Sequence, residues 1–195
     1  MLKIYFIRHG ETLSNVWNYI QGWSDTPLTA KGIAQGKQVA ERLKDVHFTA
    51  LYTSTSERAY DTACLINTYH HLPIQMCKGL KEMNFGTFEA HPEHVVGGTP
   101  AYRMNYNWNL FGGENIDDLT KRMGNTLQEL VQKHEGETGN ILCVSHSIAI
   151  LATIRFIDPS VYDNRMKNEE YIDNCSLTTI AWDGHVFTID KINVT

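Results

Sequence analysis

Four residues that lie far apart in the sequence have side chains suited to one kind of chemistry, the binding and transfer of a phosphoryl group. Arg8 and His9 follow one short apolar segment, Arg58 follows a second, and His146 follows a third. Guanidinium groups bind the dianion of a phosphate monoester through charge-assisted, bidentate hydrogen bonds. A neutral imidazole attacks phosphorus through one ring nitrogen when an acceptor holds the N–H of the other. The residue types therefore predict that Arg8 and Arg58 bind an anion and that His9 is the nucleophile.

Two further roles would complete this chemistry. His146, donating to the equatorial oxygens of the phosphoryl group, would stabilise the charge that builds up during transfer without the help of a metal. The leaving alkoxide needs a proton, and a carboxyl group with a raised pKa can supply it. Glu82 and Glu11 both fit that role by residue type. The residues alone do not decide between these two carboxyl groups.

Three short strands are predicted to carry these side chains. Residues 2–7, 50–53 and 141–144 are apolar and end at polar residues, which is typical of strands buried inside a sheet. Residues 176–182 and 185–192 flank Asp-Gly, a pair that favours a tight turn between two antiparallel strands. The sheet is therefore expected to finish with a C-terminal hairpin.

Helices are predicted between these strands. Thr29 caps a helix before residues 50–53, and Ser54 with Glu57 is interpreted as the capping box of the next helix, which places Arg58 in its first turns. An apolar stripe over residues 116–131 indicates a long helix. Its predicted start is at Asn115 and Asp118, its predicted end is at Gly136 and Gly139, and a shorter apolar helix follows over residues 148–157.

The alternation of strands and helices predicts an α/β fold with a mainly parallel central sheet, helices on both faces and a C-terminal antiparallel hairpin. Ligands of such sheets bind at the carboxyl ends of the strands, so the phosphoryl-binding side chains are expected to converge there. The length of 195 residues fits one domain, residues 1–195. Residues 90–112, rich in His, Tyr, Asn and Gly, are expected to form an insertion or lid over that edge.

Composition excludes several classes of protein. The net charge of −5 disfavours nucleic acid as a partner, and no segment has the apolar length of a membrane span. The sequence starts without a signal-peptide pattern, so a cytoplasmic location is expected. The four cysteines form no C-x-x-C pair, and the sequence His91-Pro92-Glu93-His94 has a proline that breaks helical presentation and no evident third ligand, so we expect no metal.

Four blocks of sequence add a more specific signal. They are Arg8-His9-Gly10-Glu11-Thr12, the segment Ser54-Thr55-Ser56-Glu57-Arg58-Ala59, the segment Leu80-Lys81-Glu82-Met83-Asn84-Phe85-Gly86, and Val144-Ser145-His146. In this order they resemble the histidine phosphatase superfamily, in its phosphoglycerate mutase-like branch. The resemblance covers most of the chain.

The resemblance implies a role for each matching residue. His9 would be phosphorylated, Arg8, Arg58 and His146 would bind the phosphoryl group, and Glu82, not Glu11, would be the general acid. Asn15 would assist in binding, Gln21 and Gly22 would lie at the pocket rim, and the backbone N–H of Ser147 would reach the phosphate from a helix start. The chain departs from the family pattern at Ala90, where glycine is usual, and at Ser147, where many members have Gly or Ala.

The resemblance leaves the reaction open between hydrolysis and mutase chemistry. A mutase must hold a second acidic group of its substrate, whereas residues 90–112 offer only Arg103 as an additional arginine or lysine. We therefore predict a phosphomonoesterase that hydrolyses a small organic phosphate through a phosphohistidine, without metal or cofactor. A cofactor-dependent phosphoglycerate or phosphosugar mutase and a non-catalytic phosphate-binding module are the alternatives. The sequence also leaves open whether the chain forms a homodimer.

Overall fold

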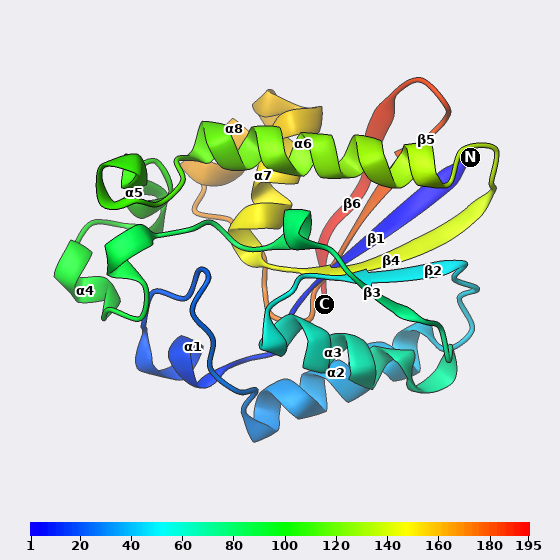
Figure 1. The fold of residues 1–195 in the computed structure, drawn as a ribbon, viewed down its shortest axis with the longest axis horizontal. Helices are drawn as coiled ribbons and strands as arrows, with labels where there is room; N and C mark the ends of the chain where they lie inside the picture. Colours follow the sequence, from blue (N-terminus) through cyan, green and yellow to red (C-terminus); the bar gives the residue numbers. More distant parts are fainter.

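The sheet has six strands in the order β3-β2-β4-β1-β5-β6 and lies at the centre of the fold (Figure 1). The computed structural model describes residues 1–195. The strands are β1 (Leu2–Arg8), β2 (Ala50–Thr53), β3 (Ile74–Met76), β4 (Gly139–Ser145), β5 (Leu177–Trp182) and β6 (Phe187–Val194). The α-helices are α1 (Leu13–Trp17), α2 (Ala30–Leu43), α3 (Glu57–Ile66), α4 (Glu93–Val96), α5 (Pro100–Met104), α6 (Ile116–Lys133), α7 (Ser147–Ile157) and α8 (Pro159–Lys167).

The four strands β3, β2, β4 and β1 are parallel, and β5 and β6 continue the sheet in antiparallel pairing. β1 pairs with β4 along its whole length, from Leu2 opposite Gly139 to Arg8 opposite Ser145. The carboxyl ends of β1, β2 and β4 therefore meet at one edge of the sheet. The predicted fold class and the C-terminal hairpin are confirmed.

Helices cover both faces of the sheet, α6, α7 and α8 on one face and α2 and α3 on the other (Figure 1). Residues of β1 alternate between the two faces because side chains of a strand point to opposite sides in turn. Ile4 and Phe6 belong to the larger buried cluster, which includes α6 and α7, and Ile7 belongs to the smaller one, which includes α2 and α3. All three side chains are fully buried. Burial of each of them stabilises the fold by about 1.5–3 kcal/mol.

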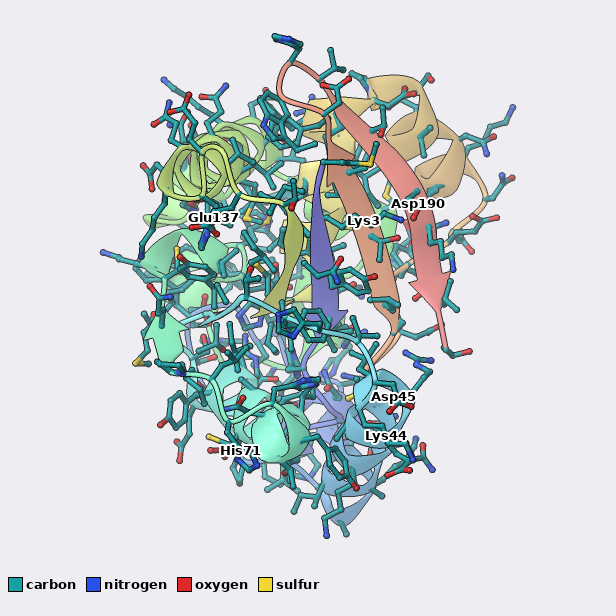
Figure 2. All side chains as sticks on the ribbon, turned by 90° about the vertical axis from the view of Figure 1, so that its right-hand side faces the viewer. Lys3, Lys44, Asp45, His71, Glu137 and Asp190 are labelled. Atoms are coloured by element: carbon teal, nitrogen blue, oxygen red, sulfur yellow. The ribbon has the colours of Figure 1, made fainter.

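The end of the molecule opposite the carboxyl ends of the parallel strands carries the loops that lead into them, and this end is seen in Figure 2. Lys44 and Asp45 follow α2, His71 precedes β3, and Glu137 lies between α6 and β4. Across the sheet, Lys3 of β1 and Asp190 of β6 form an exposed ion pair with an N–O distance of 3.3 Å. No helix combines the length and the apolar character that a membrane span requires.

Two predicted helix caps are present in the structure, whereas a third cap and the structure of residues 90–112 differ from the sequence-based expectations. Thr29 and Asn115 cap α2 and α6 as predicted, and Asn115 forms a capping box with Asp118. The predicted capping box of Ser54 and Glu57 is wrong, because the N-cap of α3 is Ser56 and makes no side-chain cap bond. The hydroxyl of Ser54 instead faces the ring of His146. Residues 90–112 contain two short helices, α4 and α5, and a 3-10 turn, Trp108–Phe111, that periodicity did not indicate.

Candidate active site

The ends of three adjacent parallel strands bring the predicted residues together. Arg8 ends β1 and His9 follows it, Ser54 follows β2 just before α3, and His146 follows β4 as the N-cap of α7. The centroids of the His9 and His146 rings lie 5.2 Å apart. Arg58, in the first turn of α3, contacts both rings. The predicted convergence at the carboxyl ends of the strands is thus observed.

His9 is held in one orientation and one tautomer. Its Nδ1 lies 2.8 Å from the carbonyl oxygen of Gly10, so Nδ1 carries the proton and donates it. Its Nε2 accepts a hydrogen bond from Nε–H of Arg58 at 3.2 Å. Burial, with the positive charges of Arg58 and Arg8, holds the pKa of His9 well below its ordinary value. The imidazole is therefore neutral at pH 7, and its Nε2 lone pair is directed at Nε–H of Arg58.

Arg58 is fully buried, and protein acceptors surround its guanidinium. Nη1 donates to the carbonyl of Ser24 at 2.8 Å and to Asp25 Oδ1 at 2.9 Å, and Nη2 donates to the carbonyl of Gly22 at 2.8 Å. Nη2 also donates to Nδ1 of His146 at 3.0 Å. A buried guanidinium is costly unless its donors are satisfied, and these contacts fix both its place and its charge.

His146 has protein partners on both ring nitrogens. Because a guanidinium only donates, the Nδ1 that faces Arg58 is the acceptor and Nε2–H donates to Oγ of Ser54 at 2.8 Å. Burial, and the positive charge of Arg58 after it, hold the pKa of His146 well below its ordinary value. The ring is buried behind the cavity described below and is not part of its wall.

The two candidate carboxyl groups have opposite surroundings. Both Glu82 oxygens accept backbone N–H groups, Oε1 from Met83 and Ala149 at 2.9 Å each and Oε2 from Ile148 at 3.1 Å. Burial raises the pKa of Glu82, although these hydrogen bonds and Arg58 oppose the shift. Glu11 accepts hydrogen bonds from the ammonium of Lys31 and the hydroxyl of Thr29. These two contacts, the Lys31 contact more strongly, lower the pKa of Glu11. Of these two residues, Glu82 lines the same cavity as His9, and Glu11 does not.

Arg8 directly precedes the nucleophile, and its side chain has few protein partners. Its Nη1 donates to the carbonyl of Ile172 at 2.5 Å, while its Nε is buried without a hydrogen-bond partner. The hydroxyl of Ser147 donates to the same Ile172 carbonyl at 3.2 Å. The amide of Ser147 is the first of α7, where a helix has no acceptor of its own for the N–H. Arg8 and Ser147 both line the cavity, and these donors are suited to bind an anion.

A cavity of about 250 Å³ opens onto these groups. Among the predicted residues, Arg8, His9, Asn15, Gln21, Glu82 and Ser147 line it, whereas Arg58, His146 and Gly22 lie behind its wall. The segment 90–112 contributes Glu93, Pro100, Arg103 and Met104 to the lining. The remaining lining residues are Tyr19, Ile20, Phe85, Ile148 and Tyr171.

The rim residues are held by short polar contacts. Asn15 Oδ1 accepts the backbone N–H of Thr12 at 3.1 Å, which leaves the amino group of its amide to donate elsewhere. Gln21 accepts the hydroxyl of Thr12 at 2.7 Å and donates to Thr26 at 2.9 Å. Gly22 lies under Arg58, to which it offers its carbonyl.

Several residues that support the site were not identified from the sequence. Glu89 accepts the backbone N–H groups of Gly22, Trp23, Ser24 and Phe85 at 2.8–3.1 Å, and so joins the two loops at the rim. Asn174 donates to the carbonyl of His9 at 2.9 Å. Asp25 accepts a hydrogen bond from Arg58 at 2.9 Å, and nothing in the spacing of the two residues indicated this contact. No three or more His, Cys, Asp or Glu side chains are grouped so that they could hold a metal ion.

Comparison with known proteins agrees with this geometry. Residues 4–195 match the family model described as "Histidine phosphatase superfamily (branch 1)". The chain belongs to the histidine phosphatase superfamily. It is therefore an enzyme of the phosphatase and phosphoglycerate mutase-like kind, and the family indicated by the sequence motifs is confirmed.

Individual relatives carry both kinds of name. The chain is 33% identical over 171 residues to "Uncharacterized phosphatase PhoE" of Bacillus subtilis, covering 86% of this chain and 85% of the relative. It is 32% identical over 197 residues to "Probable phosphoglycerate mutase GpmB" of Proteus mirabilis, covering 93% of this chain and 86% of the relative. The solved structure of YhfR from Bacillus stearothermophilus aligns with a TM-score of 0.86 at 30% identity, covering 100% of this chain and 98% of that one.

Proposed function

We propose that the protein hydrolyses a small organic phosphate monoester through a phosphohistidine on His9, with Glu82 as the general acid and without a metal. The observation that carries this proposal is the state of His9. Its Nδ1–H is bound to the carbonyl of Gly10, its pKa is lowered by burial and by two guanidinium groups, and its ring lines the cavity. A neutral, oriented imidazole beside fixed positive charge meets the requirements of a nucleophile toward a phosphate dianion.

The reaction divides into two displacements at phosphorus. Nε2 of His9 forms a bond to phosphorus while the bond from phosphorus to the ester oxygen breaks, and Glu82 gives its proton to that oxygen. Water then attacks the phosphohistidine and gives its proton to the Glu82 carboxylate. Phosphate leaves, His9 regains its neutral form, and Glu82 is again protonated.

The phosphoryl group is bound by donors that surround His9. Arg8 offers its unpartnered Nε, Arg58 moves its Nε–H from His9 Nε2 to a phosphoryl oxygen, and the Ser147 amide donates from the start of α7. Asn15 and Gln21 complete the rim. His146 lies behind the cavity wall, beside Arg58. Because a dianion favours the charged form of a nearby base, phosphate binding leads His146 to take a proton from solvent at Nδ1, and this N–H turns from Arg58 to the phosphoryl group.

The residues that segment 90–112 adds to the cavity wall favour hydrolysis over mutase chemistry, which must hold a second acidic group of the substrate. Arg103 is paired with Glu93, its Nη2 lying 2.6 Å from Glu93 Oε2, and its Nη1 donates to the carbonyl of Gly98 at 2.9 Å. The added arginine of residues 90–112 is therefore neutralised by its own neighbour. We propose that this segment, within one domain of residues 1–195, is the cover of the site and admits only a small leaving group, because the cavity measures about 250 Å³.

The relative named as a probable phosphoglycerate mutase makes mutase activity the second candidate. The test is turnover of 3-phosphoglycerate with 2,3-bisphosphoglycerate as primer, compared with phosphate release from the same mixture. Hydrolysis is expected to exceed formation of 2-phosphoglycerate. Dominant interconversion of the two phosphoglycerates would replace the phosphatase proposal with the mutase.

The test of the acid is a matched pair of variants, Glu82→Gln and Glu11→Gln. Glu82→Gln is expected to lower kcat/KM for an alkyl phosphate by roughly 100-fold or more, and much less for p-nitrophenyl phosphate, whose leaving group hardly needs a proton. Glu11→Gln is expected to change neither value more than about twofold, since its side chain is engaged by Lys31 and Thr29. Equal losses on the two substrates would reject Glu82 as the acid.

The test of metal independence is the activity of the enzyme in excess EDTA, which is expected to equal that without EDTA. A loss of activity in EDTA that is reversed by adding a metal ion would reject the metal-free chemistry.

A further inference from the structure

The segment that carries Glu82 has little regular structure of its own. The 3-10 turn Lys78–Leu80 precedes it, and a second 3-10 turn begins only at Gly86. Neither turn fixes the backbone of residues 81–84, although the Glu82 carboxyl must be placed to within a fraction of an ångström for proton transfer. Contacts from outside the segment must therefore hold it.

Arg122 of α6 makes three of the contacts that hold residues 79–82, and the indole N–H of Trp23 makes another, to the Glu82 carbonyl at 3.0 Å. Arg122 Nη1 donates to the carbonyls of Gly79 and Lys81 at 2.8 Å each, and its Nη2 donates to the carbonyl of Glu82 at 3.0 Å. Three carbonyls of one short segment thus converge on a single planar guanidinium. A lysine, with one ammonium on a flexible stem, cannot reproduce that arrangement.

Glu114 completes the contact and joins it to the other side of the segment. Its two carboxylate oxygens bind Nε and Nη2 of Arg122 at 2.8 and 2.7 Å, a bidentate pair. Its Oε2 also accepts the backbone N–H of Asn84 at 3.1 Å, and its own N–H donates to the Asn84 carbonyl at 2.8 Å. The two side chains are only 20% and 18% exposed, so solvent screens this pair less than a surface ion pair.

The close packing of α6 against the segment gives Arg122 its reach. Gly79 has no side chain, and a Cβ placed there would lie 2.1 Å from Oγ1 of Thr126, one helical turn beyond Arg122. α6 is itself fixed by its capping box and by a fully buried stripe that includes Leu119, Met123 and Leu127. The helix therefore supplies a rigid support for the segment.

We propose that Arg122 and Glu114 are positioning residues that set the place of the Glu82 carboxyl relative to the leaving-group oxygen. The inference rests on the proposed function, in which Glu82 is the general acid. The carboxyl is then held from two sides. Arg122 fixes the backbone of its segment, and the N–H groups of Ile148 and Ala149 at the start of α7 fix its oxygens. Neither Arg122 nor Glu114 lines the cavity, so both act through Glu82 without touching the substrate.

The experiment compares Arg122→Met and Arg122→Lys with the control Arg155→Met. Arg155 of α7 also forms an arginine–carboxylate pair, with Asp117 of α6 at 2.7 Å, but its hydrogen bonds go to Asp117 and Thr120 and none goes to the segment 79–84 that carries Glu82. For each variant, kcat/KM is measured with glycerol phosphate and with p-nitrophenyl phosphate. Because a displacement of about 1 Å in a reacting group costs on the order of 100-fold, Arg122→Met is expected to lose about 10- to 100-fold on glycerol phosphate. On p-nitrophenyl phosphate it is expected to lose less than about threefold, because that leaving group needs no acid.

Two further results complete the expectation. Arg122→Lys is expected to lose nearly as much kcat/KM on glycerol phosphate as Arg122→Met does, because a single ammonium does not hold three carbonyls. Arg155→Met is expected to have the kcat/KM of the wild type on both substrates. Urea unfolding of each variant shows whether it is folded under assay conditions. If Arg122→Met does not fold, Glu114→Gln, which keeps one acceptor but loses the charge of the bidentate pair, is measured in its place and is expected to show the same substrate-dependent loss.

The outcomes separate this inference from the proposed function. Equal losses on the two substrates in a folded Arg122 variant, or wild-type activity on both, would overturn the positioning role while Glu82→Gln still discriminates between the substrates. If Glu82→Gln does not discriminate, the proposed acid itself fails. Full activity of Arg122→Lys would overturn the claim that the planar fork is what positions the segment.

Discussion

His9 depends on the backbone that follows it. Gly10 offers its carbonyl to His9 Nδ1 and donates its own N–H to Thr62 Oγ1 at 3.1 Å. A Cβ on Gly10 would lie 2.5 Å from the carbonyl oxygen of Gly32 in α2, so the chain passes this helix at a distance that no side chain permits. The glycine after the nucleophile is thus required by packing, and it fixes the acceptor that selects the tautomer of His9.

Ala90 is the position at which the chain departs from the usual glycine of its family. Its φ of 61° lies in the left-handed region, which costs a residue with a Cβ about 1–2 kcal/mol. Ala90→Gly is expected to raise the free energy of unfolding by about 0.5–1 kcal/mol, because relief of this strain exceeds the added entropy of the unfolded chain. Urea unfolding at pH 7.5 measures the change.

The control for this prediction is Ala34→Gly, at an exposed position within α2. There the same substitution is expected to lower the free energy of unfolding by about 0.5–1 kcal/mol, because glycine weakens a helix interior. Destabilisation by both substitutions would contradict the strain assigned to Ala90.

Residue types predicted part of the site, and contacts decided the rest. Arg8, His9 and Glu82 were identified because their types and motifs fit phosphoryl transfer, and all three line one cavity. The sequence could not choose between Glu82 and Glu11 on physical grounds, since the difference comes from burial of one and an exposed lysine beside the other. Glu89 gave no signal, because a carboxylate that binds four backbone N–H groups is defined by loop geometry alone.

At the scale of elements, the ends of β1, β2 and β4 position the phosphoryl-binding side chains, and α6 supports the segment 79–84 that carries Glu82. The helix begins at Asn115, whose Oδ1 accepts the N–H of Asp118 at 2.9 Å. Asn115→Ala removes that cap and is expected to lower the free energy of unfolding by about 1 kcal/mol. Urea unfolding compares it with Asn125→Ala, an exposed position within the same helix, which is expected to be neutral or stabilising because alanine is the better helix former. Equal effects at the two positions would contradict the capping role.

Elements with a strong periodic or apolar pattern were predictable, and those set by tertiary contacts were not. β1, β2, β4 and α6 each bury a continuous run or stripe, which the sequence displays directly. β3 and the short helices α4 and α5 bury no such pattern. The segment 90–112 is instead ordered by aromatic packing, in which Trp108 contacts Phe85 and Phe88 with ring centroids 5.0 and 5.6 Å apart.

At the scale of the whole molecule, the buried imidazoles couple stability to pH. The pKa values of His9 and His146 are held well below the ordinary 6.5 by burial and by Arg58. The unfolded chain therefore binds more protons than the folded one as pH falls below about 6.5, and stability is lost in that direction. Glu82, with its raised pKa, acts with the opposite sign, but it is one group against two.

The free energy of unfolding is accordingly expected to fall between pH 7.5 and pH 5.5. Each imidazole contributes a slope of up to about 1.4 kcal/mol per pH unit below its ordinary pKa. Urea unfolding at several pH values measures this slope, and His146→Asn is expected to reduce it. A stability that is constant or rises toward pH 5.5 would contradict the neutral, buried state of these rings.

The proposed mechanism requires a covalent intermediate at His9. The direct measurement is mass spectrometry of the protein mixed with p-nitrophenyl phosphate and stopped in alkali, which preserves phosphohistidine, followed by mapping of the modified peptide. We expect one added phosphoryl group on His9 during turnover, and none in His9→Ala. Steady turnover with no adduct on His9, or an adduct on another residue, would contradict the mechanism.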